Sequence, residues 1–194
     1  DGGLNYLNNK KEITRAERLH KQMQIYAKNI HSLWLDKDNS LWLGLFLKGA
    51  LHYIPHLNRT VDYHLLSEEV SSGFCIIEDK NDHVWYGGPS GLFLIDKKKA
   101  NARPEKISPL RIFNLVQFND SILWAGTRKG SMFQINTRTL KVTSLPILPH
   151  TDLYVTYIYP DSHQRIWIGT DNNGLYVSDR NGSIIAFYSK EQLG

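Results

Sequence analysis

Residues 165–170 read Arg-Ile-Trp-Ile-Gly-Thr, and the tryptophan and glycine of this stretch recur at three earlier points of the chain. The four tryptophans stand 43, 39 and 43 residues apart. A repeat with a period near 40 residues is typical of propellers and other repeat architectures. The four copies read Leu41-Trp42-Leu43-Gly44, Val84-Trp85-Tyr86-Gly87, Leu123-Trp124-Ala125-Gly126 and Ile166-Trp167-Ile168-Gly169.

The residues around each tryptophan repeat as well. An aspartate stands six residues before three of the tryptophans, whereas Phe118 takes that place in the third unit. We expect the tryptophan to wedge between neighbouring sheets, the glycine to permit close approach, and the aspartate to cap turn amides. A catalytic acid would not normally recur once per unit. The residues predicted to build this structural repeat are Trp42, Trp85, Trp124, Trp167, Asp36, Asp79, Asp161, Gly44, Gly87, Gly126 and Gly169.

The last unit shows how each repeat divides into strands. Residues 154–159, 165–170, 175–178 and 183–188 are rich in β-branched and aromatic residues, and turn signals such as Asn181-Gly182 separate them. Four short antiparallel strands per repeat are typical of a β-propeller blade. The sequence therefore predicts an all-β fold made of propeller blades.

Blade boundaries follow from the same register. We expect one blade in each of residues 29–72, 73–110, 111–152 and 153–194, and the end of a preceding blade in residues 1–28. Apolar residues between positions 13 and 30 recur at a helical period, so a strand followed by a short helical turn is expected there. The total is about four and a half blades. An open part of a larger propeller is favoured over a small closed ring.

Composition narrows the class further. With 41% hydrophobic and 22% charged residues the chain is not disordered, and it holds no apolar run long enough to span a bilayer. The net charge of +4 is mild. Lys97-Lys98-Lys99 is expected to be a solvated hairpin tip, so no nucleic-acid partner is predicted.

Neither a metal nor another cofactor is predicted. The single cysteine, Cys75, excludes a disulfide framework within the chain and is expected to be a packed thiol on an inner strand. His52 and His56 are four residues apart, but Pro55 lies between them in a segment that reads as strand. The eight histidines are therefore expected to be scattered over the surface.

The full repeat unit, with its tryptophan, glycine and aspartate, resembles the two-component regulator propeller repeat. The segment from Val155 to Tyr176 carries its Ile-Trp-Ile-Gly-Thr and Gly-Leu elements, and the resemblance extends over nearly the whole chain. The other units depart from it: Leu45 and Gly88 replace the threonine, Phe118 the aspartate, and Met132 a leucine.

This resemblance implies a sensor. The repeat builds the periplasmic region of Bacteroides-type hybrid two-component system histidine kinases, which usually carry seven-bladed propellers, a small β-sandwich, one membrane helix and a cytoplasmic kinase. The region is thought to respond to oligosaccharides and to control polysaccharide-utilisation genes. The implied partners are an oligosaccharide, the remaining blades and sandwich domain, and a second copy in a homodimer. No kinase motif is present in the chain, so this segment is not expected to be an enzyme.

A ligand would meet the loops that gather on one face near the central channel. Asn, Asp and Arg side chains there can donate and accept hydrogen bonds, and a nearby ring can stack on a sugar, although such residues also suit ordinary turns. Two alternatives remain open: an interaction scaffold for dimerisation without ligand binding, and a propeller lyase, which would need a His/Glu cluster. The candidate ligand-binding residues are Arg128, Lys129, Asp171, Asn172, Asn173, Tyr154 and Asn114.

Overall fold

A computed structural model of the chain describes residues 4–7, 10–15, 29–63, 72–128, 130–146, 148 and 153–193. These residues form four four-stranded antiparallel sheets and one two-stranded sheet, β1 (Asn5–Leu7) with β2 (Ile13–Arg15). In every four-stranded sheet the strands pair in chain order. This order is the meander expected of a propeller blade.

The first two sheets span residues 30–62 and 75–108. The first sheet consists of β3 (Ile30–Leu35), β4 (Leu41–Leu45), β5 (Gly49–Ile54) and β6 (Arg59–Asp62), with a short 3-10 helix, η1 (Pro55–Leu57), before β6. The second sheet consists of β7 (Cys75–Glu78), β8 (His83–Gly88), β9 (Gly91–Asp96) and β10 (Glu105–Ser108).

The third and fourth sheets span residues 112–144 and 155–188, and a short helix, α2 (Lys190–Leu193), follows them. The third sheet consists of β11 (Ile112–Asn119), β12 (Ile122–Thr127), β13 (Met132–Asn136) and β14 (Val142–Ser144). The fourth sheet consists of β15 (Val155–Pro160), β16 (Ile166–Thr170), β17 (Leu175–Ser178) and β18 (Ile184–Tyr188).

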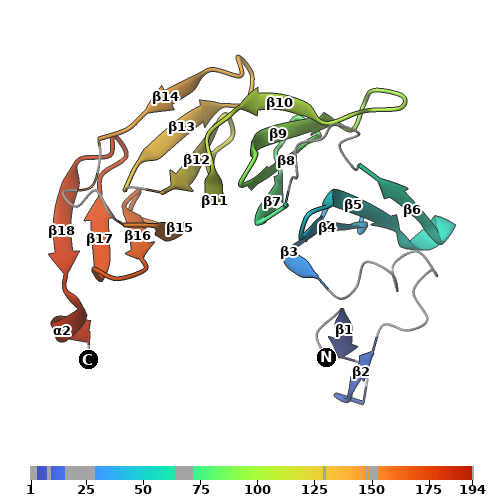
Figure 1. The fold of residues 1–194 in the computed structure, drawn as a ribbon, viewed down its shortest axis with the longest axis horizontal. Helices are drawn as coiled ribbons and strands as arrows, with labels where there is room; N and C mark the ends of the chain where they lie inside the picture. The colour runs from blue at the N-terminus through green and yellow to red at the C-terminus, as the bar shows by residue number, and fades with distance from the viewer. Residues whose placement is uncertain are drawn as a thin grey trace.

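The sheets stand side by side in an open arc (Figure 1). The first strand of each sheet, β3, β7, β11 or β15, lies on the concave side, and the fourth strand lies on the convex side (Figure 1). The predicted all-β fold of propeller blades is therefore confirmed, and the described residues form part of a propeller rather than a small closed ring. The exact blade boundaries stay a prediction.

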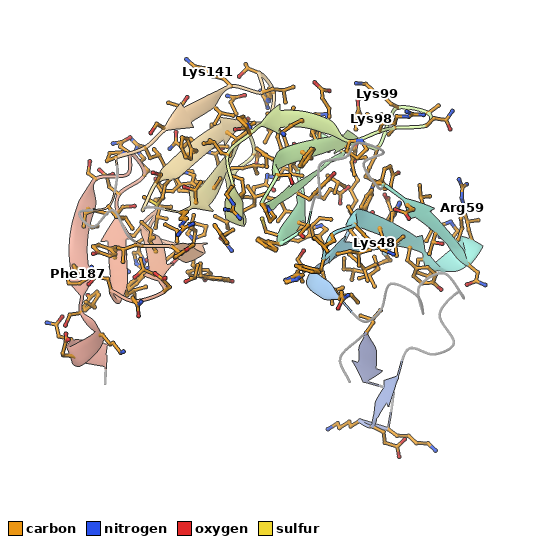
Figure 2. The ribbon with its side chains drawn as sticks, in the orientation of Figure 1. Lys48, Arg59, Lys98, Lys99, Lys141 and Phe187 are labelled. Atoms are coloured by element: carbon orange, nitrogen blue, oxygen red, sulfur yellow. The ribbon has the colours of Figure 1, made fainter. Side chains whose placement is uncertain are left out.

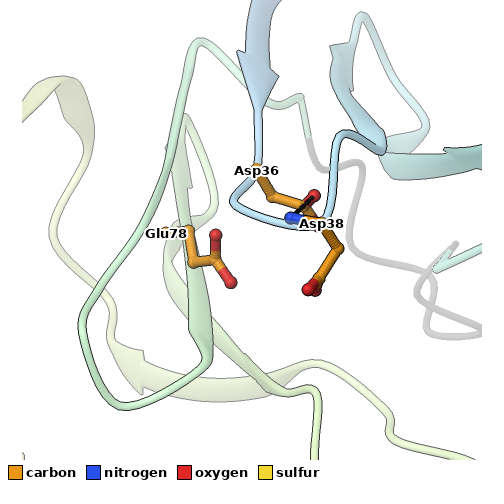
Figure 3. Close-up of side chains that lie close together, drawn as sticks. All are labelled: Asp36, Asp38 and Glu78. Atoms are coloured by element: carbon orange, nitrogen blue, oxygen red, sulfur yellow. Dashed lines mark hydrogen bonds between the residues drawn. The ribbon is translucent and has the colours of Figure 1, made fainter.

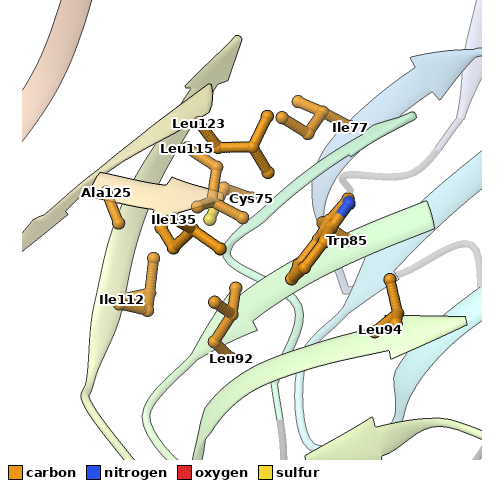
Figure 4. Close-up of a cluster of buried hydrophobic side chains, with 10 residues drawn as sticks. All are labelled: Cys75, Ile77, Trp85, Leu92, Leu94, Ile112, Leu115, Leu123, Ala125 and Ile135. Atoms are coloured by element: carbon orange, nitrogen blue, oxygen red, sulfur yellow. The ribbon is translucent and has the colours of Figure 1, made fainter. Parts of the chain in front are cut away.

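The core lies between neighbouring sheets rather than within one. Trp85 on β8 is fully buried and belongs to a cluster that includes Ile112, Leu115 and Leu123 of the third sheet (Figure 4). We call the contact between two neighbouring sheets a seam. Burying a tryptophan removes roughly 150–250 Å² of surface from water, so each seam that buries one contributes strongly to stability. Trp42 and Trp124 are likewise fully buried, with 0% of each residue exposed.

The segment whose apolar residues recur at a helical period, residues 13–30, begins with strand β2. Ile13–Arg15 is extended and pairs with β1, and the assignment of these strands to a preceding blade stays a prediction. The rest of that segment, residues 16–28, lies outside the described residues. Among the described helices, none has the length and apolar character needed to cross a membrane.

Candidate ligand-binding face

Three of the predicted ligand-binding residues meet where β15 begins. The Arg128 guanidinium carbon lies 4.9 Å from the centre of the Tyr154 ring. The backbone N–H of Tyr154 donates to Asp171 Oδ1 at 3.0 Å, and the N–H of Asp171 donates to the Tyr154 carbonyl at 3.2 Å. A cation, a phenol and a carboxylate are thereby held together at the edge of the loop face.

The other predicted residues are placed differently. Asn114 accepts a hydrogen bond from the N–H of Ile158 at 3.1 Å and so ties β11 to β15. Asn173 donates to the Tyr176 hydroxyl at 2.6 Å within its own blade. Asn172 is exposed in the β16–β17 turn, and Lys129 lies outside the described residues. Asn114 and Asn173 therefore serve local structure in this arrangement.

A continuous row of rings extends from Tyr154 across all four sheets. We define the aromatic row as Tyr154, Phe113, Phe74, His31 and Phe46. Successive ring centroids in this order are 5.5, 5.7, 5.2 and 5.5 Å apart. The row lies at the starts of the inner strands, with Phe46 contributed by the β4–β5 turn.

Most of the row was not anticipated from the sequence. His31, Phe74 and Phe113 each stand 11 residues before the repeat tryptophan of their own unit. Alignment of the units would have shown this column of rings. Phe46 is 42% exposed and His31 is exposed, whereas Phe74, Phe113 and Tyr154 are half-buried.

The repeated aspartates are committed to structure. Asp79 Oδ1 accepts from the backbone N–H groups of Asn81 and His83 at 2.7 and 3.1 Å, while its Oδ2 accepts from Trp85 Nε1 at 2.8 Å. Asp36 and Asp161 make the same bonds to their own turns and tryptophans. One carboxylate thus closes a tight turn and satisfies a buried indole.

A cluster of charges lies between the first and second sheets. Asp36 and Asp38 approach Glu78 at the end of β7 (Figure 3). Lys97 Nζ lies 2.8, 2.8 and 2.9 Å from oxygens of Asp36, Asp38 and Glu78 respectively. The ammonium group therefore supplies the cation that this group of acids attracts.

The prediction of a solvated lysine tip is wrong for Lys97 and holds only for its neighbours. The Lys97 side chain is 14% exposed, because it reaches back from the β9–β10 turn to the first sheet. Lys98 and Lys99 extend from the outer edge of the turn (Figure 2) and are 66% and 67% exposed. Of the three consecutive lysines, Lys97 therefore has a structural role.

The cluster changes the acidity of its members. Burial alone would raise the pKa of Asp36, but hydrogen bonds from Lys97, Ser40 and Trp42 hold it well below its ordinary value. Burial opposes the charge of Lys97, yet the carboxylates of Asp36, Asp38 and Glu78 raise its pKa above the usual range. Asp36 and Lys97 are therefore both charged near neutral pH.

His52 is buried, contrary to the expected scatter of histidines over the surface. Its ring stacks on Trp42 with centroids 4.0 Å apart, and its Nε2 lies 2.5 Å from Ser40 Oγ. Burial lowers the pKa of His52 to about 4. Cys75 is a packed thiol, as predicted, and burial raises its pKa to about 12.

Comparison with known families supports the resemblance inferred from the repeat. The model of the two-component regulator propeller matches residues 150–172, which include the whole of β15, the turn after it and β16. The resemblance to the two-component regulator propeller repeat is therefore confirmed, and the match lies in the fourth unit.

Relatives and solved structures agree with this assignment. Histidine kinase P4 of Formosa agariphila is 27% identical over 176 residues, which cover 81% of this chain and 13% of the relative. The extracellular domains of a putative one-component and a putative hybrid two-component system from B. thetaiotaomicron superimpose with TM-scores of 0.73 and 0.71. Both are 20% identical and cover 91% and 98% of this chain, but 25% and 26% of their own. The chain thus spans a small part of each relative, and the solved structures establish the shared fold.

Proposed function

We propose that this chain, which carries a two-component regulator propeller repeat, is a ligand-sensing propeller segment in the extracytoplasmic part of a hybrid two-component sensor. The ligand would be an oligosaccharide whose binding controls polysaccharide-utilisation genes. In a bacterium with two membranes the segment would lie in the periplasm. The remaining blades, the sandwich domain and a second copy of the sensor would be its protein partners.

The observation that carries the proposal is the aromatic row with Arg128 and Asp171 at its end. Sugar rings present apolar C–H faces that stack on aromatic side chains, while their hydroxyl groups take hydrogen bonds from charged and amide groups. Five rings in contact across four sheets offer an extended track. Such a track suits a chain of several sugar units better than one small molecule.

The segment itself would bind and perform no chemistry. The buried acids that could serve in catalysis are engaged elsewhere: Asp79 holds a turn and Trp85, and Asp36 also pairs with Lys97. The kinase activity of the whole sensor would reside outside this segment. Turnover of a lyase substrate by the isolated chain would overturn this part of the proposal.

Titration calorimetry against a panel of oligosaccharides tests the proposal. At least one glycan should bind saturably, and Phe113→Ala should weaken that binding by about fivefold or more, since stacking on one ring contributes of order 1 kcal/mol. Phe187→Ala is the matched control, because Phe187 is 41% exposed on β18, away from the row (Figure 2). Absence of any binder at millimolar concentration, or equal effects of both variants, would contradict the proposal.

A second candidate function is an interaction scaffold, and one surface favours it. The face of the fourth sheet that points away from the third carries Tyr157 and Tyr159, which are 62% and 56% exposed. Trp167 lies between them and Tyr188 and is only half-buried, unlike the other repeat tryptophans. Dimerisation that proceeds without glycan and is unaffected by it, measured by sedimentation, would favour this function over sensing.

A further inference from the structure

Each seam between neighbouring sheets has the same pair of facing positions. One position lies four residues before the tryptophan of the earlier sheet, and the other lies in the turn between the third and fourth strands of the later sheet. In the first seam these positions hold Asp38 and Lys97, whose charged groups are 2.8 Å apart. In the second seam they hold Asn81 and Thr137, which share a hydrogen bond of 3.2 Å. Both seams are closed at this point by direct contact.

The third seam differs, although its residues could pair. Its facing positions hold Asp120 and Arg180, but Asp120 forms its ion pair with Lys80 of the second sheet. Within the described part of the chain, the Arg180 guanidinium makes no ion pair; only its backbone carbonyl is engaged, by Gln134 Nε2 at 3.2 Å. The cation at this seam is therefore available.

The acids that surround the cation in the first seam are also replaced. Phe118 stands where the first seam has Asp36, and Pro160 stands where it has Glu78. The space filled by the ion cluster in the first seam is here a pocket of about 290 Å³. The residues that line it are Phe118, Asn119, Pro160, Asp161, Gln164 and Arg180.

We propose that this pocket binds a small cyclic carboxylate. The ring would lie on the apolar surface of Phe118 and Pro160, and the carboxylate would pair with Arg180, whose planar fork fits two oxygens at once. The side-chain amides of Asn119 and Gln164 offer hydrogen bonds at the rim. The volume is near the lower end of the range for small-molecule pockets, so a single ring fits.

The carboxylate of Asp161 does not prevent this binding. Its oxygens already accept four hydrogen bonds, from Trp167 Nε1, the His163 N–H, the Arg165 N–H and Arg165 Nε, at 2.7–3.0 Å. The charge of Arg165 offsets that of Asp161, which leaves Arg180 to attract an anion. A hydrogen bond from Trp167 and the bonds from the turn hold the pKa of Asp161 well below its usual range.

This site is independent of the proposed oligosaccharide function. The aromatic row lies at the beginnings of the inner strands, whereas Phe118 and Pro160 lie at the ends of β11 and β15. The pocket and the row are therefore at opposite ends of the same strands. Failure of one to bind does not affect the other.

Chemical-shift mapping of the 194-residue chain tests the pocket, with D-glucuronate, benzoate and D-glucose as probes. At least one carboxylate should saturably shift the backbone amide signals of Asn119, Gln164 and Arg180, and D-glucose should not. The two acids distinguish a hydroxylated ring from an aromatic one. No saturable shift at about 20 mM, or equal shifts with D-glucose, would overturn the proposal.

Substitutions localise the binding. Arg180→Ala should weaken the bound carboxylate by about tenfold or more, since a charge-assisted contact is lost. Arg138→Ala is the matched control, because Arg138 is exposed in the turn between the third and fourth strands of the third sheet. Unchanged affinity of Arg180→Ala would overturn the proposal. Arg180 is exposed, so its truncation removes no buried contact from the fold.

A second variant rebuilds the cluster of the first seam. Phe118→Asp combined with Pro160→Glu places two carboxylates beside Arg180 and should abolish binding, because the pocket then holds its own anions. Circular dichroism and thermal melting establish that this variant is folded. Retained carboxylate binding by the folded double variant would contradict the proposed position of the ligand.

Discussion

At the scale of single residues, the tryptophan indoles show what each repeated aspartate contributes. Trp42, Trp85 and Trp167 each donate to an aspartate six residues earlier, at 3.1, 2.8 and 2.9 Å. Trp124 follows Phe118 instead, and its buried Nε1 has no partner among the described residues. The third unit therefore carries a polar group whose burial is uncompensated, which costs stability.

Asp79→Ala should create the same defect in the second unit. It leaves Trp85 Nε1 buried without an acceptor and frees two turn amides, so we expect the free energy of unfolding to fall by about 2–3 kcal/mol. Urea denaturation measures the change. Asp120→Ala, at a side chain that is 66% exposed, is the control and should cost less than about 0.5 kcal/mol. Equal losses in the two variants would show that the hydrogen bond from Trp85 to Asp79 adds nothing measurable to the free energy of unfolding.

His52 gives the molecule a predictable response to acid. Its pKa in the folded state is about 4 because of burial, whereas in the unfolded chain it should be about 6.5. The unfolded chain therefore binds this proton first, and stability is full above about pH 6.5 and falls as the pH drops toward 4. We expect a loss of about 2 kcal/mol between pH 7 and pH 5 from this group.

Unfolding free energies measured across that pH range for His52→Phe test the assignment. The variant keeps a ring on Trp42 but cannot titrate, so its stability should depend less on pH than that of the original chain, by about the same 2 kcal/mol. His163→Phe, at an exposed turn position, is the control variant. A slope unaffected by His52→Phe would mean that another group binds the proton.

At the scale of strands and sheets, the repeat glycines set how closely neighbouring sheets approach. An added Cβ at Gly87 would lie 2.6 Å from the Ile112 side chain of the next sheet. At Gly169, the matching position in the fourth sheet, the nearest atoms would be 3.7 Å away and belong to β15 of the same sheet. The same motif therefore faces two different surroundings in one molecule.

Paired alanine substitutions use this difference. Gly87→Ala should destabilise the fold by about 1–3 kcal/mol, since the seam must open to admit a methyl group. Gly169→Ala should change stability by no more than about 0.5 kcal/mol, because the methyl group meets no second sheet. Thermal melting of both variants checks this, and similar melting temperatures would contradict the role assigned to the glycine.

Lys97 links the first sheet to the second, and its removal should weaken that link. Lys97→Met keeps the apolar stem but leaves the carboxylates of Asp36 and Glu78, 0% and 5% exposed, without their cation. We expect a loss of about 3–5 kcal/mol in urea denaturation. Lys98→Met, at a side chain that is 66% exposed, should change stability by less than about 0.5 kcal/mol. A small effect of Lys97→Met would show that the ion cluster contributes little to the link between the two sheets.

At the scale of the whole molecule, the sequence predicts the repeated parts better than the contacts between them. The spacing of Trp42, Trp85, Trp124 and Trp167 predicts the sheets because every unit needs the same wedge. Lys97 could not be placed, since its partner Asp36 lies 61 residues away on another sheet. Burial of His52 likewise depends on how the first sheet packs.

The sequence predicted the residues at one end of the candidate site, and it did not predict the rings that continue the aromatic row from there. Arg128, Tyr154 and Asp171 come together because they flank the start of one blade, which turn chemistry indicates. The rings of Phe74 and Phe113 contact each other only once two sheets stand side by side. Residue types within one unit carry no information about that arrangement.

The most direct test of oligosaccharide sensing is the crystal structure of the chain with a glycan that binds it in calorimetry. Sugar rings should lie against Phe74 and Phe113, within about 4.5 Å of their side chains, with hydroxyl groups near Arg128 or Asp171. A glycan bound away from the aromatic row, with those rings uncovered, would contradict the assignment of this face as the sensing surface.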